Sequence, residues 1–451
     1  MNIIIVGCGK VGETLAAELN RSGNNVTVID SDAVKVKAIA NKLDIMGVIG
    51  NGASRSVQKD AGIDDADLLI AVTGNDELNL LCCIVAKKAA GCRTIARIRN
   101  PEYGGDAAYI KNELGLAMII NPELAAAKEI ARIINFPSAI KVDVFAKSRV
   151  ELLTFKVPEG SRLAGMSVKE VSMKLRCGVT FCTIERGDDA YIANGNFVFA
   201  EKDVVSFIAS ARQAKSFFEK VDFKISPIKD AIIVGGGAIS YYLMEQLEKS
   251  GIACKVIEKD YGRASELATE FENATIINAN YSDEDTLKEE GIAGAGSFVA
   301  LTGIDEENIL LSLFAKKAGS RKVITKVNRI DFDDIISHLD LDSVVYPKNI
   351  TADIIVSYVR AVTNAGSSSI ETLYNLNKGK VEAAEFSVMS GSPIVGIPLM
   401  ELSLKPDVLV AAIQRGKTMI SPRGQDVIEP GDSVVVVTKG LELRDITDIL
   451  K

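Results

Sequence analysis

The chain is built from two copies of one unit, and this duplication constrains its fold more than any other feature of the sequence. The segment 2–9 (NIIIVGCG) recurs at 230–237 (DAIIVGGG), a shift of 228 residues. The segment 71–79 (AVTGNDELN) recurs at 300–308 (ALTGIDEEN), a shift of 229 residues. Similar shifts continue almost to the end, so the 451 residues are a tandem duplication with halves near 1–225 and 229–451.

The first part of each half alternates short apolar runs with amphipathic helical patterns. The helical pattern after the first run places Val11, Leu15 and Leu19 on one face and ends at Ser22-Gly23. The strands predicted in the first half are 3–6, 26–29, 45–49, 68–72, 94–98 and 117–120. Strands that alternate with helices predict right-handed crossovers and a parallel sheet covered on both faces, so we expect a Rossmann-like doubly wound domain in each half.

Each half then ends in a different kind of module. A helix is expected at 123–135 and at 349–364, and about 80 residues with short alternating strands follow it. Those strands are predicted at 150–157, 179–185, 204–208, 381–388, 408–414 and 433–438, with one helix at 167–175. The fold class is therefore α/β with two Rossmann-like domains, each followed by a small α+β module. The expected boundaries are 1–122, 123–142, 143–226, 229–348, 349–367 and 368–451.

A glycine-rich turn directly follows the first apolar run. Gly7, Gly9 and Gly12 form a GxGxxG pattern that opens the amphipathic helix, and Asp30 ends the next strand. This context is typical of a dinucleotide site, because the glycines permit a tight turn and close approach of backbone N–H groups to a pyrophosphate. An acid at Asp30 would accept hydrogen bonds from ribose hydroxyls and repel a 2′-phosphate, which favours NAD or an adenine nucleotide over NADP. The predicted contacts of this loop are Gly7, Cys8, Gly9, Lys10 and Val11.

The second copy keeps this pattern with two departures. Ser240 replaces the third glycine, Ala238 replaces Lys10, and Glu258 stands where the first half has Asp30. We interpret it as a second nucleotide site with a different preference; the alternative is a degenerate site kept for packing. Its predicted contacts are Gly235, Gly236, Gly237, Ala238, Ile239 and Glu258.

Residues at the other strand ends complete each crevice, since ligands of open α/β sheets bind at the carboxyl ends of the strands. In the first half these are Asn51, Thr73, Gly74 and Arg97; in the second they are Ala279, Asn280, Thr302 and Lys326.

Composition argues against several other functions. The net charge of −8 disfavours nucleic acid, whose binding needs basic patches. The single histidine, His338, looks structural, so no catalytic residue is assigned. The seven cysteines contain no CxxC spacing, which indicates free thiols and no metal site. No apolar run reaches the roughly 18 residues that a membrane span needs, and no signal peptide precedes the first strand, so we expect a cytosolic protein.

The two glycine loops, the acid that closes each second strand, the Thr-Gly-x-Asp-Glu-x-Asn segments at 73–79 and 302–308 and the alternating domain order together resemble the tandem RCK (KTN) family. This family comprises the regulatory subunits of Trk-type potassium uptake systems. The resemblance covers residues 1–451. It implies NAD(H) and ATP/ADP as ligands, a homo-oligomer with a tetramer favoured, and docking under a TrkH-like membrane potassium channel at the inner face of the membrane.

The residues themselves favour a sensor over an enzyme. Every segment belongs to a repeated unit, and the small modules contain no histidine. Nucleotide binding would then shift an equilibrium between domain arrangements through its different affinity for each. Two alternatives stay open at this stage: a two-domain NAD-dependent oxidoreductase, and a scaffold that has lost ligand binding.

Overall fold

The computed structural model describes residues 1–145, 150–187, 189–221, 227–328, 333–363, 368–376 and 379–451. These residues divide into two compact units that do not follow the halves of the sequence. One unit contains residues 1–131 and 229–356, and thus both Rossmann-like domains. The other contains 132–228 and 357–451, and thus both small modules. Like domains of the two halves are therefore grouped together.

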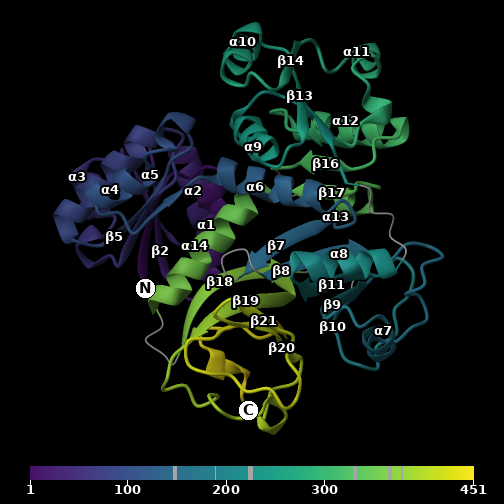
Figure 1. The fold of residues 1–451 in the computed structure, drawn as a ribbon. Coiled ribbons are helices and arrows are strands. Elements are labelled where there is room, and N and C mark those ends of the chain that lie inside the picture. The colour runs from purple at the N-terminus through teal and green to yellow at the C-terminus, as the bar shows by residue number, and fades with distance from the viewer. Residues whose placement is uncertain (146–149, 188, 222–226, 329–332, 364–367, 377–378) are drawn as a thin grey trace. The chain divides into compact units, whose positions relative to one another are not determined.

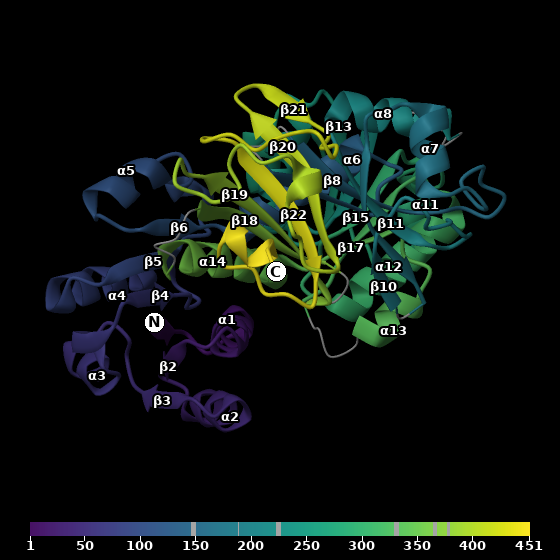
Figure 2. The same cartoon turned by 90° about the horizontal axis from the view of Figure 1, so that it is seen from below.

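The first Rossmann-like domain, drawn in purple and blue in Figure 1, has a six-stranded parallel sheet. The order of its strands is β3-β2-β1-β4-β5-β6. Its strands are β1 (Asn2–Val6), β2 (Asn25–Asp30), β3 (Met46–Ile49), β4 (Leu68–Ala71), β5 (Arg93–Arg97) and β6 (Met118–Ile120). Its helices are α1 (Lys10–Arg21), α2 (Ala33–Leu43), α3 (Arg55–Asp60), α4 (Asp76–Ala90), α5 (Ala107–Glu113) and α6 (Pro122–Asn135). Figure 2 shows α1 and α2 on one face of the sheet and α3 and α4 on the other. The predicted doubly wound sheet is confirmed.

Packing explains why these segments form this domain. Ile3, Ile5, Leu15 and Leu19 are at most 1% exposed, so the apolar face of α1 and the first strand belong to one core. On the other face, Cys82 and Cys83 of α4 lie in a core cluster with Ile4 and Val6. Both faces of β1 are therefore buried, which is why it is a continuous apolar run rather than an alternating one.

The second Rossmann-like domain repeats this topology, with sheet order β14-β13-β12-β15-β16-β17. Its strands are β12 (Asp230–Val234), β13 (Ala253–Glu258), β14 (Thr275–Asn278), β15 (Ser297–Ala300), β16 (Val323–Lys326) and β17 (Ser343–Val345). Its helices are α9 (Ala238–Lys249), α10 (Tyr261–Glu270), α11 (Glu284–Glu289), α12 (Asp305–Ala318), α13 (Asp333–His338) and α14 (Pro347–Thr363). The two crossover helices α6 and α14 both begin with proline, which suits the first helical position because it lacks an N–H.

The small modules each contain a five-stranded antiparallel sheet, as the α+β prediction required. The first is made of β7 (Lys141–Phe145), β8 (Val150–Lys156), β9 (Thr180–Arg186), β10 (Asp189–Ile192) and β11 (Val204–Ala209), with α7 (Val168–Leu175) and α8 (Ala211–Lys220). The second is made of β18 (Ser368–Leu376), β19 (Val381–Val388), β20 (Val408–Arg415), β21 (Thr418–Ile420) and β22 (Ser433–Lys439), with short 3₁₀ turns η5 (Leu399–Glu401) and η6 (Ile446–Ile449).

The sequence analysis missed four strands and one α-helix of these modules, namely β7, β10, β18, β21 and α8, and also the 3₁₀ turns η5 and η6. β7 begins at Lys141, two residues before the expected start of the module, and the linker residues expected at 364–367 lie outside the described residues. The edge strands β10 and β21 are only four and three residues long, too short for a pattern of alternation to be visible.

The two modules share one hydrophobic core. Cys182 and Ile208 of the first module and Ala412 and Val435 of the second belong to a single buried cluster. The hydroxyl of Tyr374 donates to the carbonyl of Val144 at 2.9 Å, which joins the two modules directly. Neither module buries its inner face alone, which explains why they form one unit.

Candidate nucleotide-binding cleft

A cleft of about 900 Å³ lies at the carboxyl edge of the first parallel sheet. Its lining includes residues that directly follow β1, β2, β3 and β4, the last residue of β5, and Pro122 and Glu123 shortly after β6. The ends of all six strands thus contribute to one site. This is the position where open α/β sheets hold their ligands.

Each glycine of the first loop occupies its position for a different steric reason. Gly7 has a φ of +110°, which side-chain-bearing residues rarely adopt, and a Cβ there would lie 3.0 Å from the backbone N of Thr73. A Cβ on Gly12 would lie 1.8 Å from the carbonyl oxygen of Gly7, so the helix could not pack against the strand. At Gly9 a Cβ would meet nothing within 4 Å, because that position faces the cleft. A ligand can therefore approach the backbone at Gly9 closely.

Two helix N-termini meet in this cleft. Gly9 is the N-cap of α1 and Gly237 is the N-cap of α9, and neither helix has a side chain capping its first turn. The residues that follow each cap, Lys10 and Ala238, also line the cleft. The first N–H groups of a helix lack intrahelical partners and carry partial positive charge, so both ends favour an anionic group.

Asp30 holds the first loop and faces the cleft. One carboxylate oxygen accepts from the backbone N–H of Cys8 at 2.6 Å, and the other accepts from the N–H of Asp32 at 2.9 Å. Each oxygen has a further lone pair that a ribose hydroxyl could use. Cys8 itself contributes only backbone: its side chain is 5% exposed and does not line the cleft. Burial raises the pKa of its thiol to about 12, so Cys8 acts as a small apolar residue.

The repeated Thr-Gly-x-Asp-Glu-x-Asn segment positions the edge of the cleft. The side chain of Asn79 accepts from the backbone N–H of Thr73 at 2.8 Å and donates to the carbonyl of Arg97 at 2.9 Å. Asn308 makes the same two bonds to Thr302 and Lys326, at 2.8 and 3.1 Å. The asparagine therefore holds the C-terminal ends of two neighbouring strands together, β4 and β5 in the first domain and β15 and β16 in the second. This is the structural role of the repeated motif.

The structure brings most of the predicted residues of the first half together. Those that line the cleft are Gly7, Gly9, Lys10, Val11, Asp30, Asn51, Thr73, Gly74 and Arg97. From the second half, the same cleft is lined by Gly237, Ala238, Ile239 and Lys326. The predicted residues that do not line it are Cys8, Gly235, Gly236, Glu258, Ala279, Asn280 and Thr302.

In the second half, the residues around the glycine loop have different surroundings from those in the first half. Glu258 is 8% exposed, and its carboxylate accepts from the backbone N–H groups of Gly236 and Asp260 at 2.5 and 2.7 Å. Arg263 donates to the carbonyl of Gly236 at 2.7 Å and so ties α10 to the glycine loop. The hydroxyl of Ser240 donates to the carbonyl of Gly235, in the place where the first half brings Gly12 against Gly7. Here the acid and its neighbours fasten the loop.

Several lining residues were missed by the sequence reasoning. They are Ser31, Lys35, Asn75, Glu123, Asn328 and Lys348. Glu123 and Lys348 could have been found, because each directly follows a proline after the last strand of its sheet. Both residues would have been predicted if the residues after every strand of each sheet had been considered as possible ligand contacts.

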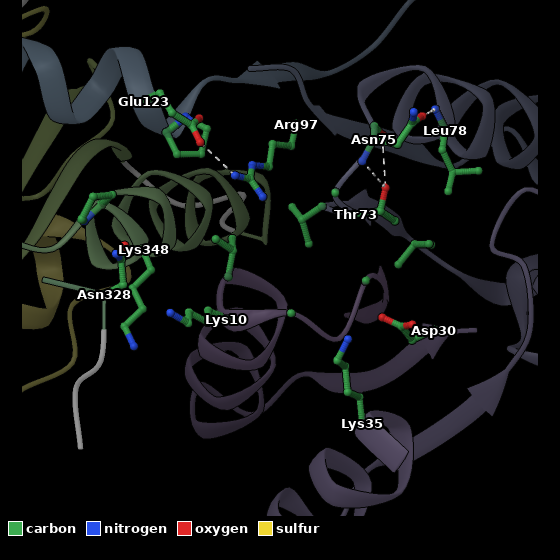
Figure 3. A pocket seen from close by; sticks show the side chains of 18 of the residues that line it. Lys10, Asp30, Lys35, Thr73, Asn75, Leu78, Arg97, Glu123, Asn328 and Lys348 are labelled. Atoms are coloured by element: carbon green, nitrogen blue, oxygen red, sulfur yellow. Dashed lines mark hydrogen bonds and ion pairs between the residues drawn. The ribbon is translucent and has the colours of Figure 1, made fainter. Parts of the chain in front are cut away.

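Several charged side chains line the cleft where β5 and β16 end. Arg97 and Glu123 form an ion pair at 3.0 Å, with side chains 14% and 17% exposed. Lys326 lies beside them, and burial lowers the pKa of its ammonium group, while the nearby Asp305 and Glu123 oppose this shift. Figure 3 shows Lys10, Asn328 and Lys348 toward one side of the cleft and Asp30 with Lys35 toward the other.

The structure also bears on the single histidine, the cysteines and the question of membrane-spanning helices. His338 is an exposed residue at the end of α13 and does not line the cleft. All seven cysteines are free thiols. Within the ranges that the structure describes, no helix combines the length and the apolar character that a bilayer crossing demands.

Comparison with known protein families gives matches over most of the chain. The TrkA-N domain matches residues 3–122 and 231–347, and the TrkA-C domain matches residues 152–222 and 383–451. Together these matches cover more than half of the chain.

One relative and two solved structures illustrate the similarity. "Trk system potassium uptake protein TrkA homolog 1" from Methanosarcina mazei is 30% identical to this chain, and the match covers 100% of each of the two chains. The structure "GsuK channel bound to NAD" has a TM-score of 0.64 at 15% identity, covering 97% of this chain and 77% of that one. "Crystal structure of the GsuK bound to ADP" has a TM-score of 0.52 at 13% identity, covering 79% and 69%. At such low identity these two structures show a shared fold.

Proposed function

Because the chain belongs to the TrkA family of potassium uptake regulatory subunits, we propose that its cleft senses NAD(H) and ATP or ADP and thereby gates a membrane potassium channel. The family membership makes the role regulatory rather than catalytic. The single observation that carries the proposal is the cleft beside Gly9, where the loop, the helix N-terminus and the acid Asp30 converge.

The residues of the cleft fit an adenine nucleotide. The open space at Gly9 admits a pyrophosphate to the N-terminus of α1, and Asp30 lies where a ribose would follow. A carboxylate at that position disfavours a ribose 2′-phosphate, so NADH is expected to bind more tightly than NADPH. The names of the two GsuK structures, one with NAD and one with ADP, agree with this ligand class.

The expected partner is a TrkH-like membrane channel subunit, and the chain would reach the inner face of the membrane through it. The expected assembly is a homo-oligomer, with a tetramer favoured. Nucleotides would act only through their different affinities for the arrangements of the assembled domains. Light scattering under reducing conditions tests the assembly, and a stable monomer at micromolar concentration would refute it.

The deciding experiment is co-purification with a potassium channel subunit, followed by potassium flux measured with ATP, ADP and NADH. We expect the chain to be retained with the channel and at least one nucleotide to change the flux. If no nucleotide binds or alters flux, the proposal is wrong. An assay for oxidation of NADH by candidate substrates serves as the control for enzymatic activity, and no turnover is expected.

A further inference from the structure

Tyr242 of the second Rossmann-like domain is bonded to two segments of the first domain that lead to walls of the cleft. Its hydroxyl accepts a hydrogen bond from the side-chain amide of Asn121 at 2.8 Å and donates one to the carbonyl oxygen of Arg99 at 3.0 Å. Tyr242 is 3% exposed. A buried hydroxyl with both a donor and an acceptor has a fixed direction, so it can hold both segments in place.

The contact with Arg99 leads to the loop that follows β4. The side chain of Arg99 donates to the carbonyl oxygen of Gly74, and its backbone N–H donates to the carboxylate of Asp76 at 2.7 Å. Gly74 lines the cleft, and Asp76 begins α4 two residues later. Arg99 therefore holds this loop in place, and Tyr242 in turn holds the backbone of Arg99.

The contact with Asn121 leads to the start of α6. The side-chain oxygen of Asn121 accepts from the backbone N–H of Leu124 at 2.8 Å and so caps the helix, while its amide nitrogen donates to Tyr242. The next two residues, Pro122 and Glu123, line the cleft, as Figure 3 shows for Glu123. Tyr242 therefore also positions this second wall.

Helix α9, which contains Tyr242, contacts the cleft directly as well. Gly237, Ala238 and Ile239 at its N-terminus line the cleft, and Tyr242 lies one helical turn after Ala238 on the same side of the helix. One helix of the second domain thus faces the cleft and holds two of its walls. A displacement of α9 would change the shape of the cleft at three places.

The equivalent positions of the duplication make different bonds. Thr14 of α1 stands at the position of Tyr242, and its hydroxyl donates to a carbonyl of its own helix at 3.0 Å. Asn328 stands at the position of Arg99, and its side-chain amide donates to the carboxylate of Asp305 at 3.0 Å. These bonds stay within one domain each, whereas those of Tyr242 join the two domains.

We propose that Tyr242 is a positioning residue through which the second Rossmann-like domain sets the nucleotide affinity of the first cleft. This inference rests on the proposed function and assigns a residue that acts on its site without touching the ligand. A nucleotide that needs Gly74 and the start of α6 in their present places binds best while Tyr242 holds them. By linkage, the bound nucleotide stabilises the contact between the two domains by the same free energy.

The test compares Tyr242→Phe, Arg99→Met and the double variant in the full-length protein. NADH affinity is measured by fluorescence and ATP affinity by titration calorimetry. For each single variant we expect both affinities to fall roughly 2- to 30-fold, the range for substitutions that act on a site without contacting its ligand. The double variant should lose no more than the larger single loss, because both substitutions break the same connection.

Tyr241→Phe is the matched control. Tyr241 is the neighbouring residue of α9, and its hydroxyl bonds Glu270 within its own domain. This substitution should change NADH and ATP affinities by less than about 2-fold. Urea denaturation of the same samples separates positioning from stability. A purely structural role for Tyr242 would lower the unfolding free energy of Tyr242→Phe and leave the nucleotide affinity of the folded protein unchanged.

The outcomes distinguish this inference from the proposed function. If the unchanged protein binds neither NADH nor ATP, the proposed function fails and this inference fails with it. If nucleotides bind and Tyr242→Phe keeps their affinity, or loses no more than Tyr241→Phe, the inference alone is wrong. It is also wrong if the losses of Tyr242→Phe and Arg99→Met add in the double variant, because Arg99 would then act independently of Tyr242.

Discussion

The side-chain amide of Asn121 donates a hydrogen bond to the hydroxyl of Tyr242 at 2.8 Å, and these two residues come from different halves of the chain. The same hydroxyl donates to the carbonyl of Arg99 at 3.0 Å, and Tyr242 is only 3% exposed. Arg99 in turn donates to the carbonyl of Gly74, which lines the cleft. A buried tyrosine of the second Rossmann-like domain is thus bonded to the segment that borders the cleft of the first.

Replacing Tyr242 with phenylalanine should weaken the contact between the two Rossmann-like domains. The hydroxyl belongs to a buried residue and has two half-buried partners, and leaving these partners unpaired should cost about 1–3 kcal/mol of unfolding free energy. Urea denaturation measures the loss. The matched control is Tyr241→Phe, because the hydroxyl of Tyr241 bonds only Glu270 of its own half at an exposed site. Equal effects of the two substitutions would show that the contact between the halves is energetically unimportant.

Asp30→Ala should reduce nucleotide affinity. In the proposed function this carboxylate accepts from the ribose, and in the structure it accepts from the N–H of Cys8 at 2.6 Å, so the substitution should affect both the ligand contact and the loop. Loss of a hydrogen bond to a charged group costs about 1.5–3 kcal/mol, or roughly 10- to 150-fold in affinity. Titration with NADH and ATP measures this change. Unchanged affinity for both ligands would place the ribose elsewhere.

Valine at Gly9 should block the cleft more severely than valine at Gly237. Neither position has an atom within 4 Å of a Cβ, so each valine is tolerated by the fold and projects toward the ligand. Gly9 begins the helix that has Lys10 and lies beside Asp30, whereas Gly237 begins a helix with Ala238 in place of the lysine. We expect the Gly9 variant to lose more ATP affinity and more channel regulation. Equal losses, or a larger loss at Gly237, would contradict this assignment.

The small modules contain a carboxyl group that should make stability depend on pH. Burial raises the pKa of Glu151 to about 7 from an ordinary 4.5, although Arg132 opposes this shift, and one of its carboxylate oxygens is buried without a hydrogen-bond partner among the described residues. At the repeated position, Glu382 instead forms an ion pair with Arg360 at 3.0 Å. The first half therefore keeps the acid but not the close pair.

Because the folded state holds the proton of Glu151 more tightly than the unfolded state, this group stabilises the fold below about pH 4.5 and loses that contribution as the pH rises toward 7. Glu151→Gln should remove this dependence, so the variant should be more stable than the natural protein at pH 8. Unfolding free energies at pH 5 and pH 8 test the prediction. As the control, Glu382→Gln should lower stability, because it breaks a pair with Arg360 that is largely buried. An unchanged pH profile in Glu151→Gln would show that the carboxyl is solvated.

Local patterns in the amino-acid sequence were enough to predict the duplication, the doubly wound sheets and the first loop. These features depend on local patterns: apolar runs followed by glycine turns, helical spacing of Val11, Leu15 and Leu19, and a glycine at Gly7 with a positive φ. Short edge strands such as β10 and β21 were invisible because they contain too few residues to show a period.

The grouping of like domains and the contribution of the second half to the cleft could be seen only in the folded chain. The sequence predicts a ligand contact for the acid of each half, yet Asp30 faces the cleft and Glu258 is buried and does not line it. Lys348 joins Lys10 in one site although 338 residues separate them in the chain. Such pairings depend on contacts between distant surfaces, such as that of Tyr242 with Asn121, and these contacts leave no periodic pattern in the sequence.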